Sequence, residues 1–303
     1  MRRIRLDRPL DLRSTLATLQ RGGGDPTGRR TATGGWWRAM RTPDGSVTIH
    51  LERQGDEVVG EAWGSGAAWS LEHLPGLVGE HDDATGLVPV HDVVRDAHRR
   101  HPGFRIARTG LVVEALVPAV IEQKVTGQEA FGGYRRLVRT YGEPAPGPGE
   151  GLGLTVAPSV QVWRQVPSWA WLQAGVDGAR SATIQRALAV APRLEECVDL
   201  DPREAHRRLL AIPGIGVWTA AEVRQRALGD ADAVSFGDYH VARNVGWALV
   251  GRETDDQGMA ELLEPYRGHR FRVTRLLELS GQVRPRRGPR MAPRTHLPRT
   301  YLR

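Results

Sequence analysis

The spacing of hydrophobic and polar positions changes along this chain and divides it into two parts. In the first part apolar and polar residues alternate, as where Val47, Ile49 and Leu51 are interleaved with Thr48 and His50. A period of two is typical of strands in a sheet with one buried face. We expect an antiparallel sheet in this part, flanked by short helices. The predicted strands cover residues 36–41, 46–52 and 57–63, and the predicted helices cover 10–19, 67–77 and 89–101.

From Leu111 onwards the apolar positions recur every three or four residues, which predicts helices. The stretch 143–153 is rich in proline and glycine and is predicted to be a loop. The fold class is therefore α+β, with a mixed sheet domain over 1–98, an all-α body over 99–283 and a basic Pro/Arg-rich tail over 284–303. The helices predicted in the body cover residues 112–120, 125–141, 159–165, 169–175, 181–193, 203–210, 217–227, 238–250, 259–266 and 270–279.

Two of these helices are joined by a glycine-rich hairpin within the segment 209–220. The residues Pro213-Gly214-Ile215-Gly216 cannot continue the first helix, because proline lacks a donor N–H and glycine permits backbone conformations that other residues rarely adopt. The second helix is predicted to begin near Val217. Its exposed N–H groups form an anion site suited to a phosphate.

The hairpin reads LxxIPGIGxWTA, and about twenty residues after its tryptophan, Trp218, comes Asp238, followed by Tyr239. In this motif and its spacing the chain resembles the helix-hairpin-helix DNA glycosylase superfamily, and most closely the bacterial 3-methyladenine DNA glycosylase II branch. The resemblance implies a sheet domain packed on a helical glycosylase body. It also implies a monofunctional DNA glycosylase that flips out and excises alkylated purines of the 3-methyladenine type in base excision repair.

The resemblance gives Asp238 the catalytic role, as the carboxylate that stabilises an oxocarbenium-like sugar and activates water. We expect Asp238 to be the N-cap of a helix starting at Tyr239. Superfamily members that nick the strand have a lysine at the position of Trp218. Tryptophan there implies an enzyme without lyase activity, and Trp218, Glu222 and Tyr239 are expected to line the base pocket.

The same resemblance assigns residues to DNA binding. In the turn Val120–Thr126, Gln123 matches the glutamine of the family, and Lys124 takes the place of its aliphatic wedge, which fills the gap left by the flipped nucleotide. The backbone carbonyls of Ile212 and Ile215 are expected to hold a monovalent cation that bridges to phosphate. The remaining predicted DNA contacts are Pro213, Gly214, Ile215, Gly216, Thr219, His240 and Arg243.

Two alternatives stay open. Glu222 departs from the aromatic residue of the related enzymes, and it could serve a glycosylase for a neutral or oxidised base. The chain could also be a non-catalytic helix-hairpin-helix DNA-binding protein, although an aspartate at the expected place disfavours this.

The composition limits which cofactors, binding partners and cellular location we expect. The formal net charge is +7, but residues 284–303 contain seven arginines and no acidic residue, so the rest of the chain is neutral overall. Lys124 is the only lysine. The single cysteine, Cys197, excludes a four-cysteine iron–sulfur cluster and fits a reducing cytoplasm. The sequence shows no membrane-spanning run, and we expect a cytoplasmic monomer that binds damaged double-stranded DNA and requires no cofactor.

Overall fold

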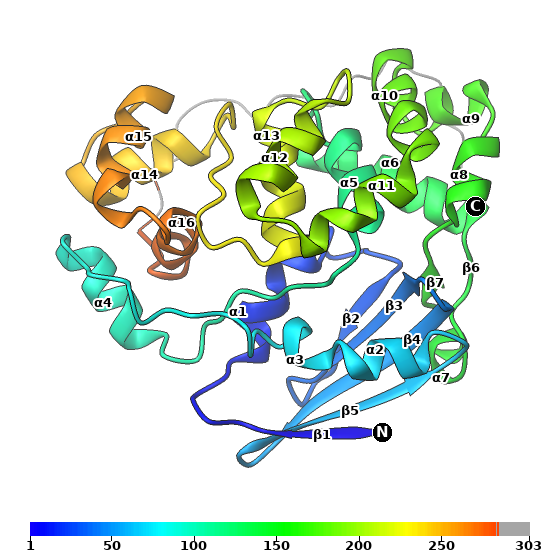
Figure 1. The fold of residues 1–303 in the computed structure, drawn as a ribbon, viewed down its shortest axis with the longest axis horizontal. Helices are drawn as coiled ribbons and strands as arrows, with labels where there is room; N and C mark the ends of the chain where they lie inside the picture. The colour runs from blue at the N-terminus through cyan, green and yellow to red at the C-terminus, as the bar shows by residue number, and fades with distance from the viewer. Residues whose placement is uncertain (283, 285–303) are drawn as a thin grey trace.

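The computed structural model describes residues 1–282 and residue 284, so the predicted tail over 284–303 lies almost wholly outside the described residues. Near its N-terminus the chain forms an antiparallel sheet of five strands in the order β1-β5-β4-β3-β2. Most of the later helices lie along one side of that sheet, while α2 (Ala67–Glu72) lies across β4 and β5 (Figure 1). The strands are β1 (Arg2–Arg5), β2 (Gly28–Arg30), β3 (Trp36–Thr42), β4 (Gly45–Gln54) and β5 (Glu57–Trp63).

The three central strands lie where they were predicted, but the opposite face of the sheet is partly covered as well, because Thr48 is completely buried between Val47 and Ile49. Trp36 pairs with Leu51 across β3 and β4, and Ile49 and Leu51 are completely buried. The edge strands β1 and β2 were not predicted, because Arg2–Arg5 and Gly28–Arg30 are short and mostly arginine. Charged edge strands of this kind discourage pairing with another chain.

Five short helices belong to the first hundred residues. The predicted helix 67–77 is split in two, because Pro75 cannot continue the hydrogen bonding of a preceding turn. These helices are α1 (Leu12–Leu16), η1 (Ala17–Leu19), α2 (Ala67–Glu72), α3 (Leu74–Leu77) and α4 (Asp92–Arg100).

The remainder is helical around α5, which is hydrophobic on all sides and buried along nearly its whole length. The helices are α5 (Val112–Ile121), α6 (Gly127–Tyr141), α7 (Pro148–Gly151), α8 (Val160–Gln165), α9 (Ser168–Gln173), α10 (Gly178–Ala189), α11 (Ala191–Glu195), η2 (Glu196–Asp199), α12 (Pro202–Leu210), α13 (Val217–Val223), η3 (Arg224–Leu228), α14 (Val241–Val250), α15 (Asp256–Leu263), η4 (Glu264–Tyr266) and α16 (Arg270–Leu279). Two further strands, β6 (Glu143–Pro144) and β7 (Thr155–Val156), form a small second sheet.

Two expectations about the helical body are wrong. The stretch 143–153 is not simply a loop, because it contains β6 and α7, and β6 pairs with β7. The helix after Asp238 begins at Val241 rather than at Tyr239. Residues 237–240 are not helical and lead into its first turn.

Buried side chains of the described residues form four hydrophobic clusters. One lies between the sheet and α1–α3, one surrounds α5, a third joins α4 to α14, α15 and α16, and a small fourth one lies where β3 meets the β6–β7 segment. The third cluster contains a buried ion pair: Asp82 accepts hydrogen bonds from the Arg272 guanidinium and from the Ile106 N–H, at 2.9 Å. The side chains of Arg272 and Asp82 are 1% and 3% exposed. This pair ties α16 to the segment that leads out of the sheet.

Replacing Asp82 by alanine is therefore expected to lower the free energy of unfolding by about 3–5 kcal/mol, because it leaves a buried guanidinium without its counter-charge. Urea denaturation measures this. The exposed pair Glu204–Arg207 on α12 provides the control, since Glu204→Ala should change stability by less than about 1 kcal/mol. Equal losses from the two variants would contradict the prediction.

Within the described residues, no helix is both long and apolar enough to cross a bilayer.

Candidate active site

The hairpin between α12 and α13 has the conformation that its glycines predict. Gly214 has a φ of +98°, and a Cβ added there would lie 2.1 Å from the Thr183 hydroxyl oxygen, so only glycine fits. The Ile215 side chain is buried and anchors the hairpin. The Pro213 carbonyl accepts a hydrogen bond from Arg186 Nε of α10 at 2.9 Å. The exposed tip is thereby held against the helical body.

Asp238 lies in the turn that leads into α14, and its carboxylate accepts hydrogen bonds from two elements. Oδ1 accepts the N–H groups of His240 at 2.7 Å and Val241 at 3.0 Å. Oδ2 accepts the indole N–H of Trp218, in the first turn of α13, at 3.1 Å. The expected capping contacts are thus present although the helix begins later than predicted. A carboxylate has about four lone-pair sites, so Oδ2 keeps one for a water or a sugar atom.

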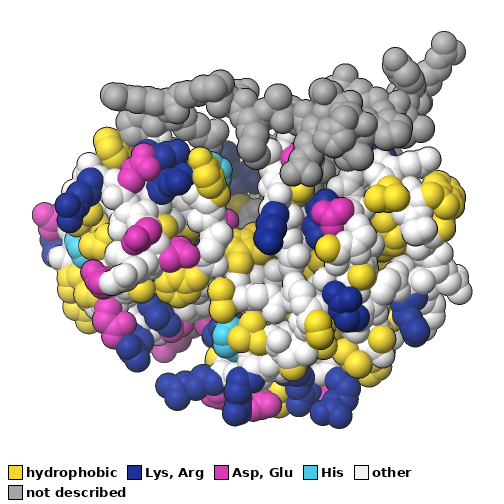
Figure 2. Space-filling view, turned by 90° about the horizontal axis from the view of Figure 1, so that it is seen from above, with side chains coloured by type: hydrophobic (Ala, Val, Ile, Leu, Met, Phe, Trp, Pro, Cys, Tyr) yellow, Lys and Arg dark blue, Asp and Glu magenta, His cyan; other side chains and the backbone are white. Residues whose placement is uncertain are grey.

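The side chains of Trp218 and Asp238 are half-buried, and Asp238 is not sealed inside packing. Seen from above, the surface is hollowed between the lobe over α14 and α15 and the lobe over α12 and α13 (Figure 2). The segment that leads from α13 to α14, which contains Asp238, joins these lobes. Trp218 and Asp238 are therefore brought together at the junction of the two lobes.

Glu222 lies one turn after Trp218, but both of its carboxylate oxygens are engaged inside the protein. Oε2 pairs with Arg226 at 2.7 Å, and Oε1 accepts the Ser235 hydroxyl at 2.6 Å. Its side chain is only 10% exposed. Gln225 donates to the same Ser235 oxygen at 2.8 Å and completes a buried polar network. Glu222 is thus a member of an internal ion pair below the Trp218 turn.

Glu278, at the end of α16, was not predicted from the sequence. Its side chain is 45% exposed and forms an ion pair with Arg275. Despite this exposure, loss of hydration raises the pKa of the Glu278 carboxyl, and the charges of Glu222 and Asp238 raise this pKa further, whereas Arg275 lowers it. A third acidic group therefore lies within electrostatic reach of Asp238. It belongs to no motif, so only the packing of α16 reveals it.

The turn between α5 and α6 meets the hairpin through Gln123. Its side-chain amide donates to the Gly214 carbonyl at 3.0 Å and to the Thr219 hydroxyl at 2.8 Å. Lys124 is exposed and has a φ of 54°. No other non-glycine residue among those described has a positive φ. A left-handed conformation is unfavourable for a side chain with a Cβ, and such strain is concentrated at functional sites. The turn presents Lys124 to solvent beside the hairpin.

The side chains after Asp238 are the most exposed part of the site. The Tyr239 ring is 67% exposed, and the Arg243 guanidinium lies over it at 4.2 Å from the ring centroid. The His240 ring meets Tyr239 edge-on. Arg243 also approaches Glu253 at 3.7 Å. Tyr239, His240 and Arg243 thus form one exposed group next to the catalytic candidate.

Two of the predicted DNA contacts have buried side chains. Thr219 and Ile215 are 2% and 5% exposed, and the Thr219 hydroxyl accepts a hydrogen bond from Gln123, so DNA would reach these two residues through their backbone. The backbone N–H of Thr219 lies in the first turn of α13, where helix N–H groups lack partners within the helix.

The predicted cation site consists of backbone carbonyls only. The carbonyls of Pro213 and Gly214 each accept one hydrogen bond, from Arg186 and from Gln123. Ile212 also accepts the Ile215 N–H at 3.0 Å, which leaves a second lone pair on its oxygen. The donor set fits a monovalent cation, and the site stays a prediction.

A cavity of about 530 Å³ lies away from these residues, between the turn after β3 and the helices α5, α8 and α11. None of the predicted site residues lines it.

The chain was compared with known protein families and solved structures. No protein-family profile matches the chain. The 3-methyladenine DNA glycosylase from Archaeoglobus fulgidus superposes with a TM-score of 0.74 at 19% identity, over 93% of this chain and 98% of that one. A Clostridium acetobutylicum 8-oxoguanine glycosylase/lyase, solved with double-stranded DNA, superposes with a TM-score of 0.68 at 12% identity, over 90% and 92%. The fold is therefore similar to that of these two DNA glycosylases.

A sequence relationship is found as well. The chain is homologous, with 34% identity over 139 residues, to the probable bifunctional transcriptional activator/DNA repair enzyme AlkA of Mycobacterium tuberculosis. The aligned segment covers 45% of this chain and 27% of that protein. This chain therefore matches only about a quarter of the length of its relative.

The strain at Lys124 yields a prediction. Lys124→Gly should raise the free energy of unfolding by about 1 kcal/mol relative to Lys124→Ala, because glycine adopts a positive φ without steric cost. Urea denaturation of the two variants measures the difference. Equal stabilities would show that the left-handed conformation is not held in the folded protein.

Proposed function

We propose that this protein is a monofunctional DNA glycosylase that excises alkylated purines of the 3-methyladenine type from double-stranded DNA in base excision repair. The observation that supports it most is Asp238. Its carboxylate is fixed by three donors and keeps a lone pair of Oδ2 for reaction. Homology to a DNA repair enzyme and the glycosylase fold support the same class of reaction.

The proposed reaction breaks the bond between C1′ of the sugar and a ring nitrogen of the base. The bonding electron pair leaves with the base, and positive charge develops on the sugar. Asp238 stabilises that charge and orients a water, which adds to C1′ and loses its proton to Asp238 or to solvent. A cationic alkylated purine leaves as a neutral base. It therefore needs no acid to protonate it, which fits a site with one fixed carboxylate.

The first turn of α13 supports the absence of lyase chemistry. Trp218 cannot form a Schiff base with C1′, and its indole N–H is bonded to Asp238. The ring holds the carboxylate in position and is proposed to contact the extruded base with its face. Incubation with a duplex containing an alkylated purine should release free base and leave the strand intact.

The proposed DNA surface is the hairpin tip, the turn that carries Lys124, and the exposed group Tyr239, His240 and Arg243. The tip offers backbone N–H groups at the start of α13 for a phosphate. Lys124 is proposed to enter the gap left by the flipped nucleotide along its alkyl stem.

The alternative that employs Glu222 on a neutral or oxidised base is disfavoured by its contacts. Arg226 and Ser235 already occupy its two oxygens, so freeing one for a base would leave a buried guanidinium or hydroxyl without its partner. The non-catalytic alternative does not account for a carboxylate held by both α13 and the turn before α14.

The central test is Asp238→Asn, which keeps the size of the side chain and removes its charge. Single-turnover release of 3-methyladenine should fall by at least about a hundredfold. Binding to a duplex with an abasic-site analogue should be retained. Unchanged release would refute the catalytic role, and cleavage of the strand trapped by borohydride would refute monofunctional chemistry.

A second test is Trp218→Phe, which keeps an aromatic ring and deletes the donor to Asp238. A hydrogen bond to a charged group contributes about 1.5–3 kcal/mol, so the release rate should fall by roughly ten- to a hundredfold. Trp169→Phe is the matched control, since Trp169 is exposed on α9. Loss of activity in both variants would argue against a specific role for the indole N–H.

A further inference from the structure

A loop of the N-terminal domain reaches the turn that carries Lys124. This loop, residues 20–27, is closed by Asp25, whose carboxylate accepts the Arg21 N–H at 2.7 Å and the Thr27 N–H and hydroxyl at 2.8 Å each. Asp25 and Thr27 are both buried. Every oxygen of that carboxylate is therefore engaged, and the loop has one defined shape.

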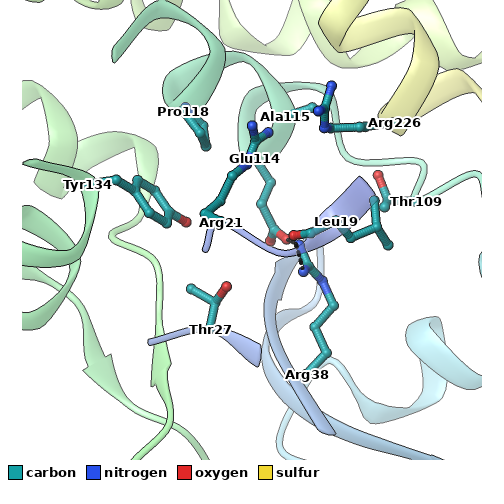
Figure 3. Close-up of a pocket in the computed structure, with 10 residues that line it drawn as sticks. All are labelled: Leu19, Arg21, Thr27, Arg38, Thr109, Glu114, Ala115, Pro118, Tyr134 and Arg226. Carbon is teal, nitrogen blue, oxygen red and sulfur yellow. Dashed lines mark hydrogen bonds and ion pairs between the residues drawn. The ribbon is translucent and has the colours of Figure 1, made fainter. Parts of the chain in front are cut away.

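The 3-10 helix η1, which leads into this loop, is held by arginines of two other elements. Arg38 of β3 donates to the Leu19 carbonyl at 3.0 Å, and Arg226 of η3 donates to the Thr18 carbonyl at 2.9 Å. Figure 3 shows Arg21, Arg38 and Arg226 converging with α5 around a small cavity at this junction. The base of the loop is thus tied to the sheet and to the helix that follows the hairpin.

From this support the Arg21 side chain forms an ion pair with Glu122, the residue that ends α5. The two side chains are only 7% and 17% exposed. Burial lowers the pKa of the Arg21 guanidinium, but Glu122, Glu222, Tyr134 and Asp25 together raise this pKa above its ordinary value. Glu122 lies two residues before Lys124, in the same turn.

The other neighbours of Lys124 are held as well. The Ile121 carbonyl accepts a hydrogen bond from the buried Arg180 at 2.7 Å, Gln123 is bonded to the hairpin, and Thr126 forms a capping box with Glu129. Lys124 itself is exposed and strained. The ion pair connects this strained turn to the N-terminal domain.

We propose that Arg21 is a positioning residue for nucleotide flipping: through its ion pair with Glu122, the N-terminal domain holds the turn that presents Lys124 to DNA. Arg21 itself contacts neither the base nor the sugar. The proposal rests on the proposed function only in that the protein opens a DNA duplex. A buried ion pair suits this task, because it stabilises little in net terms but imposes one geometry on its partners.

The test uses Arg21→Met and Glu122→Gln in the full-length protein, with a duplex that contains 2-aminopurine next to an alkylated purine. Unstacking of 2-aminopurine raises its fluorescence and reports flipping apart from chemistry. Both variants should lower the flipping signal and the single-turnover rate at saturating enzyme by about tenfold or more. Affinity for undamaged duplex should change less than about twofold. The double variant Arg21→Glu/Glu122→Arg should recover part of the signal.

Arg272→Met is the matched control, because it breaks a buried pair of the same kind far along the chain from Lys124. It should lower thermal stability like Arg21→Met and leave flipping intact. Flipping by Arg21→Met equal to that of wild type, or an equal loss in Arg272→Met, would overturn the proposal. So would a wild-type protein that gives no Lys124-dependent signal.

The two proposals fail separately. If wild type flips the nucleotide in an Arg21-dependent way and releases no base, the positioning role stands and the proposed chemistry falls. If wild type releases base and Arg21→Met flips normally, the chemistry stands and the positioning role falls.

Discussion

The hydrogen bond from the Trp218 indole to Asp238 is the contact on which the site depends. It joins the first turn of α13, fixed by the hairpin, to the turn before α14, and these two elements belong to different lobes of the molecule. Two N–H groups at the start of α14 hold the other oxygen of the same carboxylate. One acidic group therefore takes its position from both lobes, and a change in their relative placement would alter the geometry at the reacting atom.

The protein also contains buried ion pairs, although apolar residues of similar size at these positions would stabilise the fold as well. Arg272–Asp82 and Arg21–Glu122 each connect segments that are distant in sequence, whereas Arg226 and Glu222 are only one helical turn apart. Net stabilisation from such pairs is small, because the loss of hydration offsets the attraction. Their value lies in a defined orientation of the joined elements.

Much of this architecture could be predicted from local patterns. Alternation predicted the central strands, and the glycines and proline of 213–216 predicted the hairpin, because such residues act over short distances. The role of Asp238 was a prediction from the resemblance of this motif and its spacing to a known superfamily. The edge strands were missed because Arg2–Arg5 has almost no apolar signal. The pair Arg21–Glu122 joins residues 101 positions apart, and Glu278 reaches the site only through packing. No local pattern reports such contacts, nor the left-handed backbone at Lys124.

The engagement of Glu222 also bears on how this site can diverge. Its two oxygens, the Arg226 guanidinium and the Ser235 hydroxyl satisfy one another in a space with little access to water. An apolar side chain at position 222 would leave the Arg226 guanidinium without its counter-charge, and a smaller side chain would leave a cavity. Substitutions at positions 222, 226 and 235 should therefore have occurred together during evolution, and these three positions should covary among natural variants.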